Sequence, residues 1–296
     1  MDAAKFMTWQ IGDVKITRVA ELGGAPFPGT FMFAQASPEL VLRHAWLKPH
    51  FAHEDGRLFG SIHSFVIESG KRRIIVDTCV GNDKTRTVRA WNLLQGPFLD
   101  DLALAGFPAQ TIDTVLCTHL HVDHVGWNTR LVNGKWVPTF PNARYLFGRK
   151  EWAYWSAEQS RDGDVMGDSV RPIVDAGLAE LVDTDHVLTA DVRLEPTPGH
   201  TPGHVSVRIS SRGKEAVITG DLMHHPLQCA EPDLANNFDV DADAARRTRR
   251  DFLARCANRP VLVLGTHFAP PTGGWVVDAD RAWRLALTPP TGAGST

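Results

Sequence analysis

The chain has 296 residues, which suffices for one large domain or two small ones. Its 43% hydrophobic and 22% charged residues are typical of a globular protein that folds in water. A formal net charge of −3 gives no basic footprint of a protein that binds nucleic acid or an anionic membrane, so we expect neither as a partner.

The start of the chain and its cysteines bear on the cell compartment. Residues 1–5 lack the apolar run of a secretory signal, and no later stretch approaches the roughly 18 apolar residues of a membrane-spanning helix. The four cysteines form no Cys-x-x-Cys pair, which argues against a disulfide framework. We therefore expect a cytoplasmic protein.

The first part of the chain predicts strands on either side of an aromatic arm. Stretches 14–20, 61–69 and 72–77 have the pattern of strands. The arm, about 21–60, is rich in aromatic and turn-forming residues, and a helix is predicted with Ser37 as its N-cap. Apolar residues in an irregular segment need cover, so the arm packs on the protein's own core, closes over a pocket as a lid, or forms a homodimer contact.

The motif His-x-His-x-Asp-His places four possible metal ligands within six residues. It follows the apolar stretch 114–117, which predicts a buried strand. Side chains alternate along an extended segment, so His119 and His121 point the same way and can bind one ion together. If a helix begins at Asp123, then Asp123 and His124 project from its first turn and can hold a second ion. Imidazole and carboxylate donors favour Zn²⁺ and also admit Mn²⁺, Fe²⁺ or Co²⁺.

More candidate residues stand where apolar strands or rigid turns end. Asp77 follows the apolar residues 74–76, and we expect it to orient a ligand histidine from behind. Three times a glycine at such an end is followed, within two residues, by a metal-binding side chain: His200, Asp221 and His267. Repetition of this pattern predicts a site for two divalent ions.

The remaining segments predict further helices and strands. Helices are expected at 97–106, 150–158, 169–176 and 241–258, and strands at 135–138, 143–148, 180–182, 192–195, 204–209, 215–219 and 261–266. The basic run 246–250 is expected to be a solvated helix face, and the acidic residues Asp239, Asp241 and Asp243 to complement the positive start of that helix.

Together these residues resemble the metallo-β-lactamase fold superfamily of hydrolases, from about Val14 to Trp275. The resemblance implies an α/β (α+β) fold, an αββα sandwich of two mixed β-sheets packed between helix layers, as one domain spanning 1–296. It also implies a distribution of ligands: one ion takes His119, His121 and His200, the other takes Asp123, His124 and His267, and Asp221 bridges them.

Within the superfamily, the long arm and the segment 220–225 look most like the branch of quorum-quenching N-acyl homoserine lactonases and methyl parathion hydrolase-type esterases. Many of these lactonases have a tyrosine three residues after the bridging aspartate, where this chain has His224. The resemblance implies that a hydroxide bridging the metals opens a lactone or cleaves a carboxylic ester. A phosphotriesterase or aryl esterase and a glyoxalase II-like thioesterase are the alternatives, and a non-catalytic metal-binding protein is disfavoured.

Two sets of residues are expected to act on the substrate. Asp123 or His224 would pass a proton to the departing alkoxide, although a structural role for His224 and its neighbour His225 stays open. Phe31, Phe33 and Trp127 would form an apolar wall for an acyl chain or aryl ring.

Overall fold

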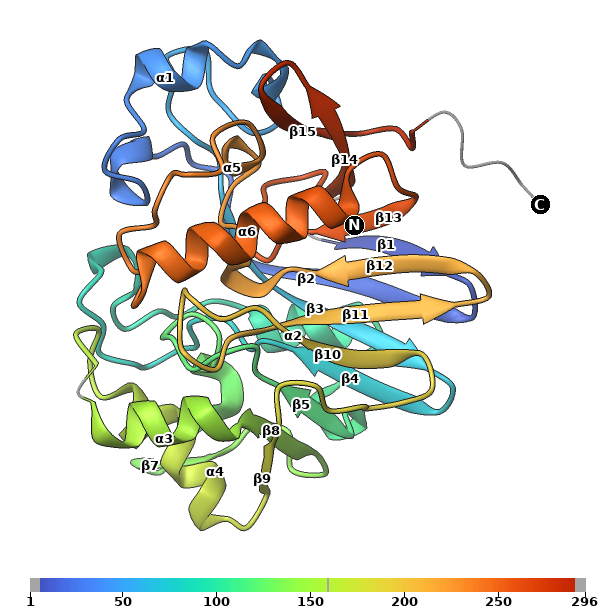
Figure 1. Ribbon diagram of the computed structural model, residues 1–296. Helices are drawn as coiled ribbons and strands as arrows, with labels where there is room; N and C mark the ends of the chain where they lie inside the picture. Colours follow the sequence, from blue (N-terminus) through green and yellow to red (C-terminus); the bar gives the residue numbers. More distant parts are fainter. Residues whose placement is uncertain (1–5, 159, 291–296) are drawn as a thin grey trace. The chain divides into compact units, whose positions relative to one another are not determined.

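The computed structural model (Figure 1) describes residues 6–158 and 160–290. Contacts between residues divide the chain into two compact units, each assembled from two stretches. Unit 1 holds the chain up to Leu22 together with Ile62–Thr189, and unit 2 holds Gly23–Ser61 together with the chain from Ala190 onward. That the two units form a single domain stays a prediction.

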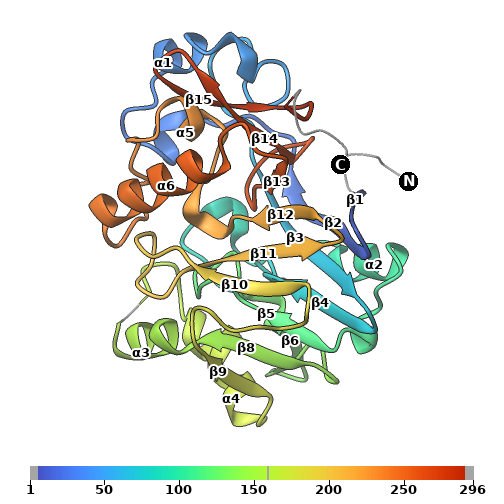
Figure 2. The same cartoon turned by 45° about the vertical axis from the view of Figure 1, so that its right-hand side comes forward.

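Unit 1 contains a seven-stranded mixed sheet in the order β1-β2-β3-β4-β5-β8-β9 (Figure 2) and a two-stranded sheet, β6-β7. The strands are β1 (Phe6–Ile11), β2 (Val14–Gly23), β3 (Ser61–Ser69), β4 (Arg72–Val76), β5 (Thr114–Leu116), β6 (Thr129–Val132), β7 (Lys135–Pro138), β8 (Arg144–Gly148) and β9 (Ala179–Val182). Strands β4, β5, β8 and β9 run parallel. Parallel neighbours end at the same sheet edge, so β4 and β5 deliver Asp77 and the histidine motif to one edge.

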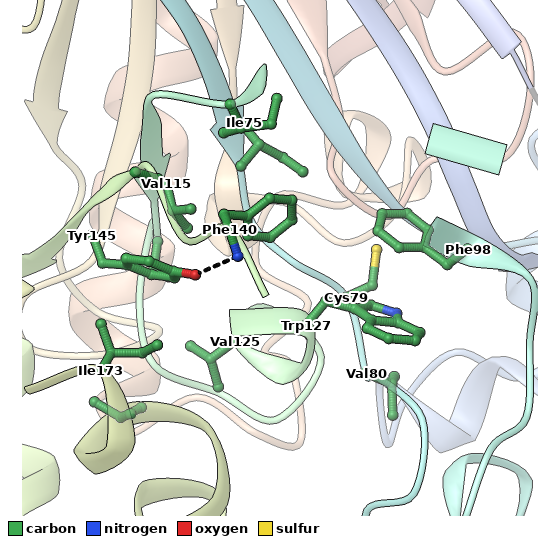
Figure 3. Close-up of a cluster of buried hydrophobic side chains, with 14 of the residues drawn as sticks. Ile75, Cys79, Val80, Phe98, Val115, Val125, Trp127, Phe140, Tyr145 and Ile173 are labelled. Atoms are coloured by element: carbon green, nitrogen blue, oxygen red, sulfur yellow. Dashed lines mark hydrogen bonds between the residues drawn. The ribbon is translucent and has the colours of Figure 1, made fainter. Parts of the chain in front are cut away.

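The helices of unit 1 are short, and they pack with the sheet around one core (Figure 3). They are η3 (Arg89–Trp91), α2 (Phe98–Leu104), η4 (Ala109–Thr111), η5 (Gly126–Asn128), α3 (Arg149–Ala157), the π-helix η6 (Met166–Val170) and α4 (Arg171–Asp175). The buried Tyr145 hydroxyl accepts the N–H of Phe140 at 2.9 Å and donates to the carbonyl of Asn128 at 3.1 Å. The core therefore satisfies its polar group internally.

Unit 2 contains a six-stranded mixed sheet in the order β10-β11-β12-β13-β14-β15. Its strands are β10 (Val192–Pro196), β11 (Val205–Ser211), β12 (Lys214–Ile218), β13 (Val261–Leu264), β14 (Gly273–Ala279) and β15 (Ala282–Ala286). Its helices are η1 (Gly29–Phe31), α1 (Pro38–Leu42), η2 (Ala45–Leu47), η7 (Gly220–Leu222), α5 (Leu227–Ala230) and α6 (Ala242–Cys256). Strands β12 and β13 are parallel, so Asp221 and His267 follow them at one edge.

The arm lies in unit 2 and buries its apolar side chains in the core of that unit. Phe33, Leu47 and Phe51 are fully buried there, and the rings of Phe51 and Phe268 meet edge to face with centroids 6.4 Å apart. Burying large aromatic side chains supplies much of a core's stability. The arm is therefore an integral part of unit 2.

Most expected elements are present with ends shifted by a few residues, and the two mixed sheets confirm the predicted α/β class. Ser37 caps α1, since its Oγ accepts the N–H of Leu40 at 3.3 Å, and Asp241 caps α6 by accepting the N–H of Ala244 at 2.9 Å. Strands β1, β6, β14 and β15 were not predicted. No helix among the described residues has the length and apolar character needed to cross a bilayer.

Two local expectations are wrong. The chain forms a turn at Asp123 and no helix begins there. Arg249, in the basic run expected to be solvated, is fully buried and donates to the carbonyls of Leu222, Pro232 and Leu234 at 3.2, 2.9 and 2.8 Å. Its guanidinium therefore joins α6 to the end of η7 and to the loop after α5.

Candidate metal centre

Unit 1 brings the four residues of the histidine motif together in a bend and turn after β5; we call His119, His121, Asp123 and His124 cluster 1. The rings of His119 and His121 have centroids 4.7 Å apart, and one ring nitrogen of each lies within 4.8 Å of the other. Leu120, between them, is buried in the core of unit 1. The two imidazoles can therefore bind one ion, although the backbone between them is bent.

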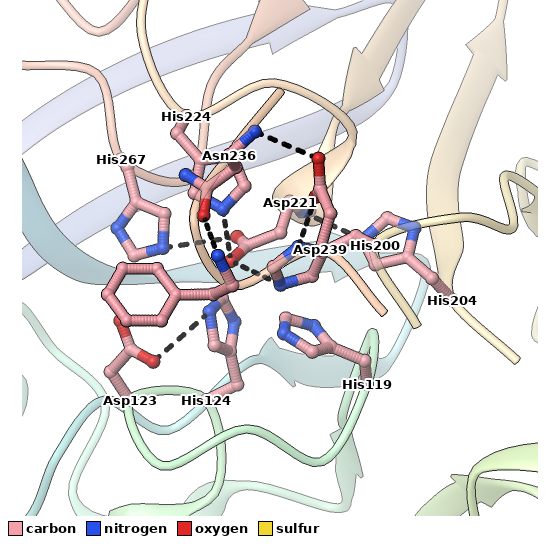
Figure 4. Close-up of polar contacts among 12 residues, drawn as sticks. His119, Asp123, His124, His200, His204, Asp221, His224, Asn236, Asp239 and His267 are labelled. Carbon is pink, nitrogen blue, oxygen red and sulfur yellow. Dashed lines mark hydrogen bonds and ion pairs between the residues drawn. The ribbon is translucent and has the colours of Figure 1, made fainter. Parts of the chain in front are cut away.

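The turn after His121 places the other two members of cluster 1. The N–H of His124 donates to the carbonyl of His121 at 3.1 Å, and His124 Nε2 lies 3.7 Å from Asp123 Oδ1 (Figure 4). The backbone then pairs with the segment after β4, because Thr78 N–H donates to the His124 carbonyl at 2.7 Å and Gly126 N–H to the Cys79 carbonyl at 2.8 Å. A Cβ on Gly126 would overlap the carbonyl of Val80, so this approach requires glycine.

Asp77 holds cluster 1 in place. Its Oδ1 accepts the backbone N–H of Thr118 at 2.8 Å, and its Oδ2 lies 3.0 Å from His124 Nδ1. Asp77 itself has a left-handed backbone, with φ of 56°. A carboxylate on the far nitrogen of a ligand imidazole fixes the tautomer that leaves the other nitrogen as the ligand. This geometry suits the role expected for Asp77.

Unit 2 gathers its candidate ligands around Asp221, and we call His200, Asp221 and His267 cluster 2 (Figure 4). Asp221 Oδ2 lies 3.3 Å from His200 Nε2, whereas Asp221 Oδ1 lies 3.1 Å from His267 Nε2. The two oxygens of one carboxylate thus serve two different imidazoles. His204, which the ligand set leaves out, accepts the backbone N–H of Asp221 at its Nε2, at 2.8 Å.

His200 has a carboxylate at each of its ring nitrogens. Its Nδ1 lies 2.9 Å from Asp239 Oδ1, and its Nε2 faces Asp221. Burial lowers the pKa of His200, but the hydrogen bonds and charges of the two aspartates outweigh that effect and raise the pKa to about 9. The position therefore attracts positive charge strongly.

His224 is the third imidazole on Asp221, with its Nε2 3.0 Å from Oδ2. Burial lowers the pKa of His224, although Asp221 opposes that effect. Its Nδ1 is buried and has no hydrogen-bond partner among the residues that the structure describes. His224 therefore presents, beside cluster 2, a buried polar atom without a hydrogen-bond partner among the described residues.

The donor atoms of both clusters fit divalent metal ions. Imidazole nitrogens and carboxylate oxygens are ligands that Zn²⁺ and other first-row divalent ions prefer. The buried carboxylate of Asp221 and the raised pKa of His200 indicate that cluster 2 favours a cation. Four buried free thiols belong to neither group of donor atoms, so no thiolate enters the ligand set: Cys79, Cys117, Cys229 and Cys256.

The three expected pocket residues lie in different surroundings. Phe33 is fully buried and meets the His224 ring edge to face at 6.4 Å. Trp127 is buried in the core of unit 1, and its Nε1 donates to Glu21 at 2.6 Å. Phe31 alone of the three is exposed, at 42%.

Two acidic residues beside the clusters were missed as parts of the site. Asp239 was interpreted only as part of the acidic start of α6, whereas it contacts His200. Glu21, at the end of β2, accepts the N–H groups of Val80 and Gly81 at 2.8 and 3.1 Å, and burial raises its pKa to about 6. The sequence offers one signal for each residue: Asp239 is a carboxylate just before the N-cap of α6, and Glu21 is a carboxylate near the end of β2.

Comparisons with known proteins agree with this picture. Residues 57–282 match the model of the metallo-beta-lactamase superfamily. A curated N-acyl homoserine lactonase of Bacillus cereus is 24% identical over 169 residues, which are 52% of this chain and 60% of that protein. This chain therefore spans less than two thirds of that relative's length.

Solved structures share the fold over nearly the whole chain. A hydrolase named AbOPH, described as in the beta lactamase superfamily, has a TM-score of 0.79 at 24% identity, covering 97% of this chain and 99% of that one. AidC, described as a dizinc quorum-quenching lactonase in complex with a product, has a TM-score of 0.78 at 19% identity, covering 99% and 100%. At such identities the likeness concerns the fold.

Proposed function

The chain belongs to the metallo-beta-lactamase superfamily, and from this premise we propose that it is a metal-dependent hydrolase that opens a lactone or cleaves a carboxylic ester. Two solved relatives described as hydrolase and lactonase share its fold, which supports the reaction class. The proposal rests above all on one observation, the division of the Asp221 carboxylate between two imidazoles.

We propose that clusters 1 and 2 together hold two divalent ions, with Zn²⁺ preferred. One ion would be bound by His119, His121 and His200, and the other by Asp123, His124 and His267. Asp221 would bridge them, because its Oδ2 faces a ligand of the first ion and its Oδ1 faces a ligand of the second. When bound, such a pair polarises a carbonyl group and makes water nucleophilic at neutral pH.

The side chains around the ligands have tasks of their own. Asp77 keeps the ring of His124 in one tautomer through its contact with Nδ1 at 3.0 Å. Asp123 or His224 would carry the proton that the departing alkoxide needs. His224 is suited to this because burial keeps its imidazole neutral and its Nδ1 has no partner among the described residues.

One aromatic surface bears on the substrate class. An exposed aromatic surface around Phe31, whose ring meets those of Phe27 and Phe238, offers contact to an acyl chain or aryl ring. A glyoxalase II-like thioesterase would need a basic cluster, and Arg281 and Arg284 near the β14–β15 hairpin make only a poor one. A phosphotriesterase or aryl esterase of the methyl parathion hydrolase type stays the second candidate, since the same donors suit it.

A metal analysis combined with a substrate panel tests the proposal. We expect two ions per chain and turnover of N-acyl homoserine lactones or simple carboxylic esters. We expect His119→Ala and Asp221→Ala each to lose bound metal and to lose activity by more than about 100-fold. A loss of about 100-fold is the upper end of what removal of a residue that only contacts a metal ligand costs. The exposed residues His50 and Asp251 provide matched controls, His50→Ala and Asp251→Ala. Metal-free protein that ions do not activate would contradict the proposal, and turnover of S-lactoylglutathione alone would replace the substrate class.

A further inference from the structure

We propose that Asp239 is the positioning residue of His200: it fixes the imidazole in the tautomer and orientation that make Nε2 the ligand atom. The proposal rests on the proposed metal centre and concerns a residue outside the ligand set. His200 Nδ1 and Asp239 Oδ1 are 2.9 Å apart, and the two side chains are only 2% and 1% exposed. A buried contact of this length between an imidazole and a carboxylate is a charge-assisted hydrogen bond.

Asp239 is itself held rigidly. Its Oδ2 accepts the backbone N–H of Asn236 at 2.9 Å, and its own N–H donates to the Asn236 carbonyl at 3.1 Å. Each carboxylate oxygen therefore has one N–H donor, Asn236 on Oδ2 and His200 on Oδ1. This arrangement leaves the carboxylate little freedom to turn.

The backbone beside His200 is attached to the same loop. Val240 N–H donates to the His200 carbonyl, and Asp241 N–H donates to the Gly199 carbonyl, both at 2.9 Å. Residues 199–200 and 239–241 thus contact each other through both backbone and side chain. A shift of the loop would move the imidazole with it.

The hydrogen-bond chemistry requires a carboxylate at this place. With Nδ1–H donating to Asp239, the lone pair of Nε2 points to the side where Asp221 Oδ2 lies 3.3 Å away. An amide has only one acceptor oxygen. In Asp239→Asn the NH₂ group would therefore face one of the two donors, the N–H of Asn236 or that of His200. If the NH₂ group met His200, the ring would have to carry its proton on Nε2, which is then no ligand.

The place of Asp239 also suits a ligand. A carboxylate behind an imidazole strengthens that imidazole as a metal ligand, and Asp239 Oδ1 lies on the far nitrogen of His200.

Asp239→Asn tests the proposal by metal affinity, measured by competition with a chromophoric chelator, and by the visible spectrum of the Co²⁺-loaded protein. We expect the affinity for one of the two ions to fall about 10- to 100-fold and the Co²⁺ bands to shift. Asp241→Asn is the matched control: it makes the same change two residues away, at the N-cap of α6, where asparagine caps as well as aspartate. We expect it to keep both affinity and spectrum.

Equal affinities and spectra for Asp239→Asn and the wild type would overturn the proposal, as would equal losses in both variants. Wild-type protein that binds no ion would overturn the metal centre itself, so the two failures are distinguishable. A measurement on the wild type alone tests the proposal even where the Asp239→Asn variant misfolds. In ¹⁵N histidine NMR spectra of the zinc-loaded wild type, we expect the proton of His200 on Nδ1, and a proton on Nε2 would overturn the proposal.

Discussion

His224 and His225 are neighbours in the chain but meet opposite environments. His224 contacts Asp221, whereas His225 donates from Nε2 to the carbonyl of Phe51 at 2.9 Å and accepts the N–H of Leu227 at Nδ1, at 3.0 Å. Burial lowers the pKa of His225 to about 4. Both nitrogens of the neutral ring are used, so His225 joins the arm to the start of α5 as a structural residue.

The lowered pKa of His225 predicts an acid-sensitive fold. The unfolded chain takes up a proton at this residue below its ordinary pKa of 6.5, and the folded chain does so only near 4. The free energy of unfolding therefore falls as the pH drops through this window, by up to about 3 kcal/mol from this residue. We expect His225→Gln to be less stable than the wild type at pH 7, with the difference shrinking towards pH 4.5.

Urea unfolding at both pH values, with excess chelator so that ions do not compete with protons, measures this difference. His50→Ala, at an exposed histidine, is measured at both pH values as the control for loss of a histidine side chain. A stability difference between His225→Gln and the wild type that does not change with pH would contradict the assignment.

The side chain of Asn237 joins the arm to the loop before α6. Its Nδ2 donates to the carbonyls of Thr30 and Phe31, both at 3.0 Å, and its Oδ1 accepts the N–H of Ala34 at 3.1 Å. Its backbone N–H also donates to the Met32 carbonyl at 2.8 Å. The irregular segment at the tip of the arm therefore depends on a loop about 200 residues later in the sequence.

Asn237→Ala should loosen the arm tip without unfolding unit 2. The variant loses three side-chain hydrogen bonds, each worth about 0.5–1.5 kcal/mol, and keeps the backbone bond. We expect the amide of Ala34, which loses its acceptor, to exchange with deuterium about tenfold faster or more, as measured by hydrogen exchange. Asn142→Ala, which removes an exposed hydrogen bond to Gln110 in unit 1, should leave this amide unchanged. Unaltered exchange in Asn237→Ala would mean that the arm tip is held by its other contacts.

At the scale of the whole molecule, the chain passes three times between the units, after residues 22, 61 and 189. Cluster 1 comes entirely from unit 1 and cluster 2 entirely from unit 2. If the ions are bound as we propose, metal binding adds to the stability of the folded chain, because the unfolded chain has no such site.

Removal of the ions should lower the melting temperature. By mass action, an ion present at 1,000 times its dissociation constant stabilises the folded state by about 4 kcal/mol. We expect EDTA to lower Tm in differential scanning calorimetry and Zn²⁺ to restore it. In Asp221→Ala, which lacks the proposed bridge, the same additions should change Tm far less. Equal responses of the two proteins would contradict the bridging role of Asp221.

Residues near each other in the sequence could be predicted well. Cluster 1 lies within six residues after an apolar strand, so the sequence alone places its members near one another. Their final arrangement also depends on Asp77 and on the backbone of residues 78–79. The N-caps Ser37 and Asp241 are likewise local, since each bonds the N–H three residues later. Asp221 and His267 each follow an apolar strand in the sequence, which is why they lie at an edge of the six-stranded sheet.

Only the tertiary structure decided the features that depend on partners distant in sequence. The backbone at Asp123 could form a helix by propensity, but its neighbours bond to residues 78–79, which a separate strand delivers. Arg249 is buried because three carbonyls of distant loops face it, and Asp239 meets His200 across 39 residues. The sequence pattern indicates which side chains tend to be buried and which can bind a metal ion. The groups that satisfy them are set by how the chain folds back on itself, and a buried polar group is stable only where those partners are present.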